Sequence, residues 1–167
     1  MSTQSSVSTA PKPAARVGRL RHWLVRHAGR VEKVYAAFEH LLFAAAPGMA
    51  RIGFDRIERP VAALEGALKA ALFDCKMCGQ CVLASTGMSC PMNCPKTLRN
   101  GPCGGVRANG HCEVRPDMPC VWVKAYEGSL VMRKPAQIGV ALPAINHALK
   151  GQSSWLLEAR HHLKVQP

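Results

Sequence analysis

The sequence has few aromatic residues and no long apolar run. Only 5% of its 167 residues are aromatic, so a core must rest on Ala, Leu and Val side chains. It contains no run of about 18 apolar residues, which argues against a transmembrane helix. Its N-terminus lacks the apolar stretch of a secretory signal. We therefore expect a cytoplasmic protein in a reducing compartment, with no membrane span.

Acidic residues are absent before Glu32, although this stretch contains several arginines. Residues 1–15 are rich in Ser, Ala and Pro, a composition shared by transit peptides and disordered basic arms. Because the basic stretch continues directly into a helical pattern, we favour the basic arm.

Cysteine is absent before residue 75 and after residue 120, and all eight cysteines lie in between. In a reducing compartment such density indicates metal or redox chemistry rather than disulfides. The segment has no helical or strand period and is rich in Gly and Pro, so metal must supply the stability that buried apolar area cannot. We predict that every one is a metal ligand: Cys75, Cys78, Cys81, Cys90, Cys94, Cys103, Cys112 and Cys120.

The first three cysteines form the run C-x2-C-x2-C, which bacterial ferredoxins use for three corners of a [4Fe–4S] cluster. The fourth ligand of such clusters precedes a proline, as Cys90 and Cys94 both do here. Eight thiols would supply two clusters. Zinc, held by paired C-x2–4-C knuckles, is the alternative or additional metal. Disulfides or free thiols are a third reading.

The division of the ligands between two sites does not follow from spacing alone. Our assignment places Cys75, Cys78, Cys81 and Cys120 in the first site. The second site then takes the remaining four: Cys90, Cys94, Cys103 and Cys112. His111 is a further candidate ligand, but eight cysteines make it unnecessary.

A helix is predicted over residues 17–46, ending at Pro47-Gly48. Its apolar stripe steps by three and four: Leu24, Ala28, Val31, Tyr35, Phe38, Leu42 and Ala45. A second helix is predicted over 60–73, with Pro60 at its first position. The apolar side of this second helix comprises Val61, Leu64, Leu68 and Leu72. Shorter helices are expected at 121–132 and around 144–150.

The predicted fold is mostly α, a small single domain with an N-terminal helical extension and an irregular, metal-bound cysteine-rich region. In order, we expect a disordered basic arm (1–15), an amphipathic helical segment (16–59), a cysteine-rich metal-binding domain (60–134) and a C-terminal tail (135–167). The stripe of the first helix could pack on the second helix or on another protein. We take its Leu24–Leu42 portion as the candidate docking face for a partner.

The string from Leu72 to Trp122 contains CGQC, CPMNCPK and RNGPCGGV in this order. It resembles the cysteine-rich methylenetetrahydrofolate reductase C-terminal domain family, with weaker similarity in LPAINHALKGQSSW at 142–155. The resemblance implies a small subunit that carries iron–sulfur clusters, with zinc also present in the family. Such a subunit relays electrons to a flavin-containing, barrel-shaped partner that reduces 5,10-methylenetetrahydrofolate.

A (β/α)8 barrel needs about 200–250 residues, and this chain shows no alternation of strands and helices. The flavin and folate sites are therefore expected on the partner, and the chain is expected to be a non-catalytic or electron-transfer subunit. Two alternatives are a structural zinc module without redox activity and a nucleic-acid-binding zinc protein. The net charge of +12 favours nucleic acid, but residues 75–120 contain no aromatic side chain for base stacking.

Overall fold

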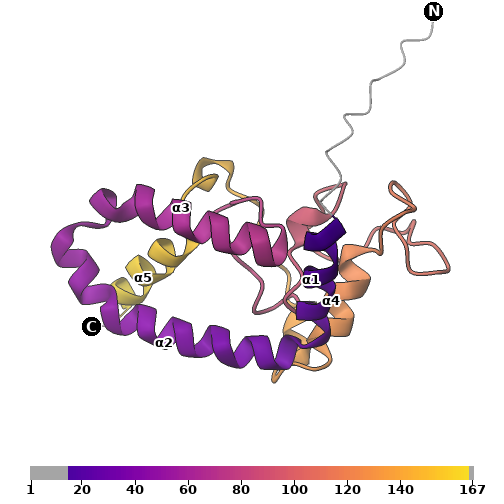
Figure 1. Cartoon of the computed structure of the whole chain (residues 1–167), viewed down its shortest axis with the longest axis horizontal. Coiled ribbons are helices and arrows are strands. Elements are labelled where there is room, and N and C mark those ends of the chain that lie inside the picture. Colours follow the sequence, from indigo (N-terminus) through magenta and orange to yellow (C-terminus); the bar gives the residue numbers. More distant parts are fainter. Residues whose placement is uncertain (1–14, 166–167) are drawn as a thin grey trace, which may run out of the picture.

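The computed structural model describes residues 15–165, which form a mostly helical domain (Figure 1). Its five α-helices are α1 (Ala15–Arg26), α2 (Ala28–Ile52), α3 (Phe54–Phe73), α4 (Val121–Ser129) and α5 (Ser154–Val165). Within these residues there is no β-strand, only an isolated bridge between His111 and Pro119. Of the basic arm predicted over residues 1–15, only the last residue lies within the described part of the chain. No described helix combines the length and apolar character needed to cross a bilayer.

The helices α2 and α3 form a long hairpin that turns at Gly53 (Figure 1). Gly53 has a φ of 97°, a backbone conformation that glycine adopts without a steric penalty. The C-terminal helix α5 packs against both arms of the hairpin. Aromatic contacts fix α5 on α2, since Phe38 lies 4.7 Å from Trp155 and Phe43 stacks 4.1 Å from His162 between ring centroids.

The single helix predicted over 17–46 is wrong, because the chain breaks at His27 into α1 and α2. The bend brings Gly29 against the backbone of Val131, where a Cβ would approach the carbonyl oxygen to 2.2 Å. This close contact lets α1 pack on α3 and α4 while α2 packs on α5. The predicted stop at Pro47-Gly48 is also wrong, since α2 continues through Pro47 to Ile52.

The end of the helix predicted over 60–73 is confirmed. Its predicted start is wrong, and its apolar side is not the buried one. It begins at Phe54, so Pro60 lies inside it. The predicted apolar side faces outward, with Leu64 58% exposed and Leu68 47% exposed. The buried residues of α3 are instead Glu65, Lys69 and Phe73.

The main hydrophobic cluster joins α1, α2 and α3 to the loops beyond them. Its buried members are Leu24, Ala28, Phe73, Leu83, Met88, Cys90 and Met132, with Val31 and Tyr35 packed against them. The first half of the predicted docking stripe therefore lies in the interior, and Phe38 further along it contacts Trp155. The start of the stripe is therefore a packing face of this chain, whereas Tyr35, Phe38 and Leu42 border a wide cavity.

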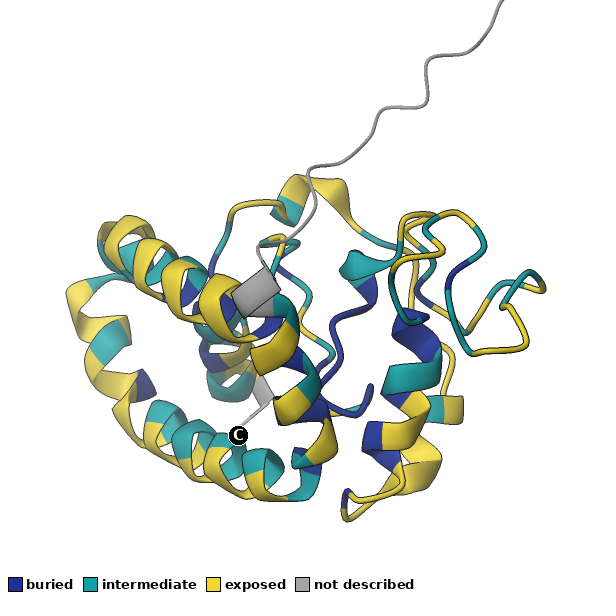
Figure 2. Cartoon of the chain, turned by 45° about the vertical axis from the view of Figure 1, so that its right-hand side comes forward, coloured by how far each residue is buried: buried dark blue, intermediate teal, exposed yellow. Residues whose placement is uncertain are grey.

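The cysteine-rich region runs between α3 and α4 without regular structure apart from a 3-10 turn at Pro91–Asn93. Its residues 86–91 are all buried, where the chain passes between the helices (Figure 2). Further along, the loop before α4 extends away from the helices (Figure 1). The predicted helix at 121–132 is confirmed as the shorter α4, and that around 144–150 is a 3-10 turn at His147–Leu149.

Candidate metal centre

The loop that carries the first three cysteines leaves α3 in a tight turn. Asp74 closes the helix with a φ of 53°, and its N–H donates to the carbonyl of Ala70 at 3.0 Å. Met77 and Gly79 then adopt φ values of 46° and 74°. Left-handed backbone at a residue with a side chain is strained and concentrates at ligand-binding sites.

Four of the eight cysteines line one narrow cavity of about 20 Å³: Cys75, Cys78, Cys81 and Cys90. Burial is the main influence on the pKa of Cys75 and of Cys90, and the other thiols of this set raise both values further. The first three are the run that the sequence assigns to one site. The structure brings Cys90 to the cavity beside this run, whereas Cys120, the predicted fourth ligand, does not line it.

The turn after Cys81 explains why Cys90 is the fourth member. The Thr86 hydroxyl bonds to the carbonyls of Val82 and Ser89, both at 2.9 Å. Gly87 packs on α4, where a Cβ would lie 2.1 Å from the Ala125 carbonyl oxygen. These contacts fold the chain back so that Cys90 returns to the cavity.

Two of these sulfurs accept hydrogen bonds from the backbone. The Met77 N–H donates to Cys75 Sγ at 3.3 Å, and the Met92 N–H bonds to Cys90 in the same way. Burial raises the pKa of Cys90 to about 12 and also raises the pKa of Cys75. A metal that binds these thiols must therefore displace their protons.

The thiol of Cys81 is the exposed member of the set. It interacts with Lys69 and with the Tyr35 hydroxyl. Cys81 also lines a second, wider cavity of about 700 Å³, bounded by Tyr35, Phe38 and Trp155 among others. The two cavities thus meet at Cys81.

The other four cysteines do not line the first cavity. Cys103 lies 3.4 Å from Glu113, which is also bonded to Lys96. Cys120 is buried with Trp122 in a separate hydrophobic cluster. In the part of the chain that the structure describes, no three His, Cys, Asp or Glu side chains stand close enough together to hold a metal ion.

His111, the further candidate ligand, sits beside the buried Cys112. Its Nδ1 atom lies 2.7 Å from the carbonyl oxygen of Pro116. This contact orients the ring within the loop.

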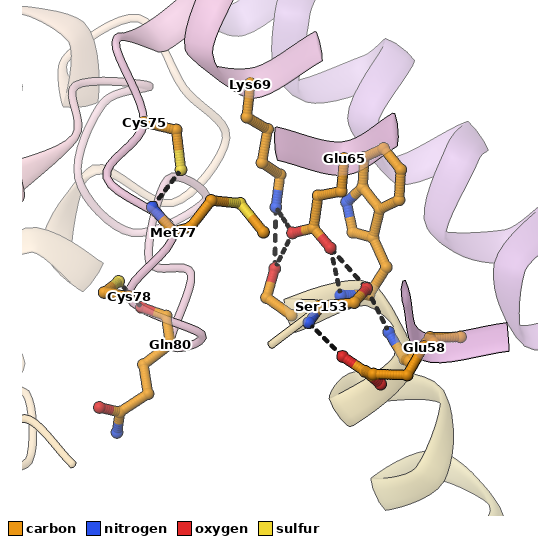
Figure 3. Close-up of polar contacts among 11 residues, drawn as sticks. Glu58, Glu65, Lys69, Cys75, Met77, Cys78, Gln80 and Ser153 are labelled. Atoms are coloured by element: carbon orange, nitrogen blue, oxygen red, sulfur yellow. Dashed lines mark hydrogen bonds and ion pairs between the residues drawn. The ribbon is translucent and has the colours of Figure 1, made fainter. Parts of the chain in front are cut away.

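A buried polar network lies next to the cavity, on the inner side of α3 (Figure 3). Lys69 Nζ lies 2.7 Å from Glu65 Oε1 and 2.8 Å from Ser154 Oγ. Ser153 Oγ donates to the other Glu65 oxygen at 2.6 Å. The side chain of Met77 extends from the cysteine loop toward this pair (Figure 3). The network places an ion pair on the cavity wall, since both Glu65 and Lys69 line it.

Both members of this pair are ionised. Burial would raise the pKa of Glu65, but Lys69 and the two serine hydroxyls outweigh it and lower the value. Burial would lower the pKa of Lys69, but Cys81 and Glu65 outweigh it and raise the value.

Three basic side chains are buried in the described part of the chain: Arg21, Lys69 and Arg99. Arg21 lies 3.8 Å from Asp74, and Lys69 is paired with Glu65. Arg99 lines the cysteine cavity, and its Nε and Nη1 atoms are buried without a hydrogen-bond partner among the described residues.

The sequence reasoning missed Glu65, Lys69 and Arg99. The i,i+4 spacing of Glu65 and Lys69 indicates a helical ion pair, but it carries no sign that the pair is buried. Arg99 opens the string RNGPCGGV, and in that string only the cysteine has the chemistry of a metal ligand.

The donor set fits a metal–thiolate group in its chemistry. Such a group is anionic, and its sulfurs accept backbone N–H bonds. The cavity offers four thiols, two N–H···S contacts and a buried guanidinium with free donors. The thiols could bind the metal, the backbone N–H groups could donate to their sulfurs, and the guanidinium could balance the negative charge.

Residues 54–148 match the family described as methylene-tetrahydrofolate reductase C terminal. The match includes α3, all eight cysteines and α4, whereas α1, α2 and α5 lie outside it. No curated protein and no solved structure matches the chain.

Proposed function

This chain belongs to the methylene-tetrahydrofolate reductase C-terminal family, and on that premise we propose that it is a metal-bearing accessory subunit of a methylenetetrahydrofolate reductase-type complex. The observation that carries the proposal is the meeting of Cys75, Cys78, Cys81 and Cys90 at one cavity. Three come from the ferredoxin-like run, and the fourth precedes Pro91, as in ferredoxins.

A [4Fe–4S] cluster bound here would carry one electron at a time. The four cysteine thiolates would hold it, and the N–H groups of Met77 and Met92 would donate to the ligand sulfurs. Metal binding and loop folding are coupled, so we expect residues 75–81 to rearrange and widen the cavity on binding. The remaining four cysteines would hold a second cluster or a zinc ion.

Electrons would leave through Cys81. This thiol is exposed and borders the wide cavity between α2 and α5, whereas Cys90 is buried. A redox partner that approaches this cavity therefore comes close to one ligand of the centre. The partner we propose is a flavin-containing reductase subunit, which would bind the folate, in a reducing cytoplasm.

The first experiment is metal analysis of the whole chain, purified anaerobically and then reconstituted with iron and sulfide. We expect iron and sulfide in equal amounts and visible thiolate-to-iron absorption. Zinc at full stoichiometry without iron would overturn the redox role and support a structural zinc module. Such a module should lose its fold on chelation.

The second experiment tests the relay to flavin. The chain is purified from its native source together with whatever protein stays bound, and its cluster is reduced chemically. We expect a flavoprotein to co-purify and its flavin absorbance to bleach when the reduced chain is added. The Cys78→Ser variant serves as the control. Co-purified flavoprotein whose flavin stays oxidised would contradict the relay.

A further inference from the structure

We propose that Arg99 is the counter-cation of the metal–thiolate group held by Cys75, Cys78, Cys81 and Cys90. In this role its guanidinium donates hydrogen bonds to sulfur and raises the reduction potential of a bound cluster. The inference rests on the proposed function, because it assumes that the four cysteines bind a metal group.

The first argument is that Arg99 is buried with unused donors. Its side chain is only 8% exposed, and both Nε and Nη1 are shielded from solvent without a partner in the described structure. Arginine remains charged in proteins and presents five N–H donors. Burying such a charge without a partner is strongly unfavourable, so native proteins pair it.

The second argument compares the three buried cations near the cysteines. Arg21 faces Asp74, and Lys69 faces Glu65, so each has its own carboxylate. Only Arg99 of these three lacks a carboxylate in the described structure. It nevertheless lines the same cavity as the four thiols. A bound anion at the thiols would supply the missing charge.

The third argument is that the residues on either side of Arg99 are anchored. Trp122 Nε1 donates to the carbonyl of Leu98 at 3.0 Å. The Asn100 side chain accepts from Leu142 N at 2.7 Å and donates to Leu142 O at 3.0 Å. These contacts hold Arg99 at the cavity wall without using its own side chain.

A fixed positive charge affects a cluster in a definite direction. Reduction adds one electron, supplied by the chemical reductant, and makes the group more negative. Arg99 stays protonated in both states, so no proton moves with the electron. The guanidinium therefore stabilises the reduced form more than the oxidised form and raises the potential.

The test compares Arg99→Leu with wild type after reconstitution, using a potentiometric titration followed by electron paramagnetic resonance. We expect the reduced-to-oxidised ratio at a fixed potential to fall about tenfold, which for one electron corresponds to about 59 mV. Arg99→Lys, which keeps the charge, should stay closer to wild type. Arg51→Leu is the matched control, since it removes an exposed arginine at the end of α2 and should leave the potential unchanged.

Circular dichroism of the proteins after reconstitution, compared with reconstituted wild type, shows whether the variants fold. If Arg99→Leu does not fold, Arg99→Gln replaces it as the neutral variant. Loss of iron from a folded neutral variant, with iron kept by Arg51→Leu, would also support the proposal. A neutral variant with wild-type iron content and wild-type potential would overturn the role of Arg99 alone. Wild-type protein that holds no iron would overturn the proposed function, and this inference with it.

Discussion

Lys69 lies one helical turn after Glu65 on α3, and the pair is buried with 2.7 Å between Nζ and Oε1. The carboxylate also receives hydrogen bonds from Ser153, Ser154 and the N–H of Trp155 at the start of α5. A negative charge at a helix N-terminus is favourable, so the pair and α5 stabilise each other.

Replacing Glu65 with Ala should destabilise the protein strongly. The change leaves the Lys69 ammonium buried without its carboxylate and frees the two serine hydroxyls. Breaking a buried pair in this way costs about 3–5 kcal/mol. Urea denaturation of the variant and of wild type measures the difference in the free energy of unfolding.

The double variant Glu65→Leu/Lys69→Met serves as its control. Replacing both charges by apolar groups of similar size is often neutral or stabilising. We therefore expect the double variant to recover much of the loss. A double variant as unstable as Glu65→Ala would show that the charges themselves are needed at this interface.

The grouping of the cysteines can be tested by metal content. Cys78→Ser and Cys90→Ser should each lose about half of the bound metal, because both remove a ligand of the same site. The double variant should lose no more than either single variant. Cys120→Ser combined with Cys78→Ser should lose more than Cys78→Ser alone. Additive losses for Cys78 and Cys90 would place them in different sites.

The stability of the protein should fall on acidification because of His22. Its Nδ1 atom is buried without a partner in the described structure, and burial lowers the pKa of the ring. The cations Arg21, Lys124 and Arg26 lower it further, against the opposite effect of Glu127. The unfolded chain therefore binds a proton at a higher pH, near the ordinary value of about 6.5.

The neutral His22 ring contributes its full stabilisation at pH values above the pKa that the ring has in the unfolded chain. This contribution is lost as the pH falls through the lower pKa that the ring has in the folded protein. We expect the free energy of unfolding to decline as the pH falls below about 6.5, and to decline less in His22→Gln. Urea titrations at several pH values measure both slopes. Parallel slopes would rule out His22 as the cause.

Gly128 should not tolerate a methyl group. A Cβ at this position would lie 2.2 Å from the Gly87 carbonyl oxygen, a backbone atom that cannot easily move. Although alanine favours helices, Gly128→Ala should cost about 1–3 kcal/mol through overpacking. Thermal denaturation measures the loss. Gly139→Ala is the control, because no atom lies within 4 Å of its Cβ and its stability should change by less than about 0.5 kcal/mol.

The sequence predicts that most of residues 17–73 and 121–132 are helical, but it predicts neither the break at His27 nor which side of α3 is buried. Its leucines repeat at helical spacing, and from one chain segment alone an apolar side is expected to face inward. The inner side carries Glu65 and Lys69 instead, because Ser153 and Ser154 arrive from far along the chain to satisfy them. No local pattern contains that information. The break at His27 depends in the same way on Val131, which is distant in sequence.

The sequence predicts three of the four cysteines that line the cavity as members of one group, and their role as ligands stays a prediction. The run Cys75, Cys78 and Cys81 follows from spacing alone. Choosing Cys90 rather than Cys120 requires the turn closed by Thr86, whose side chain bonds to two backbone carbonyls. The role of Arg99 cannot be inferred from the sequence. It is suggested only by the folded structure, in which Arg99 lines the cavity and its buried donors lack a partner among the described residues.

The carboxylate of Glu65 also has a consequence for how the chain can be divided. The segment shared with the family stops at residue 148, yet three donors to this acid come from Ser153, Ser154 and Trp155. A fragment trimmed to the shared segment would keep the acid and lose those donors. We therefore expect a fragment that ends at residue 148 to be less stable than one that extends through α5.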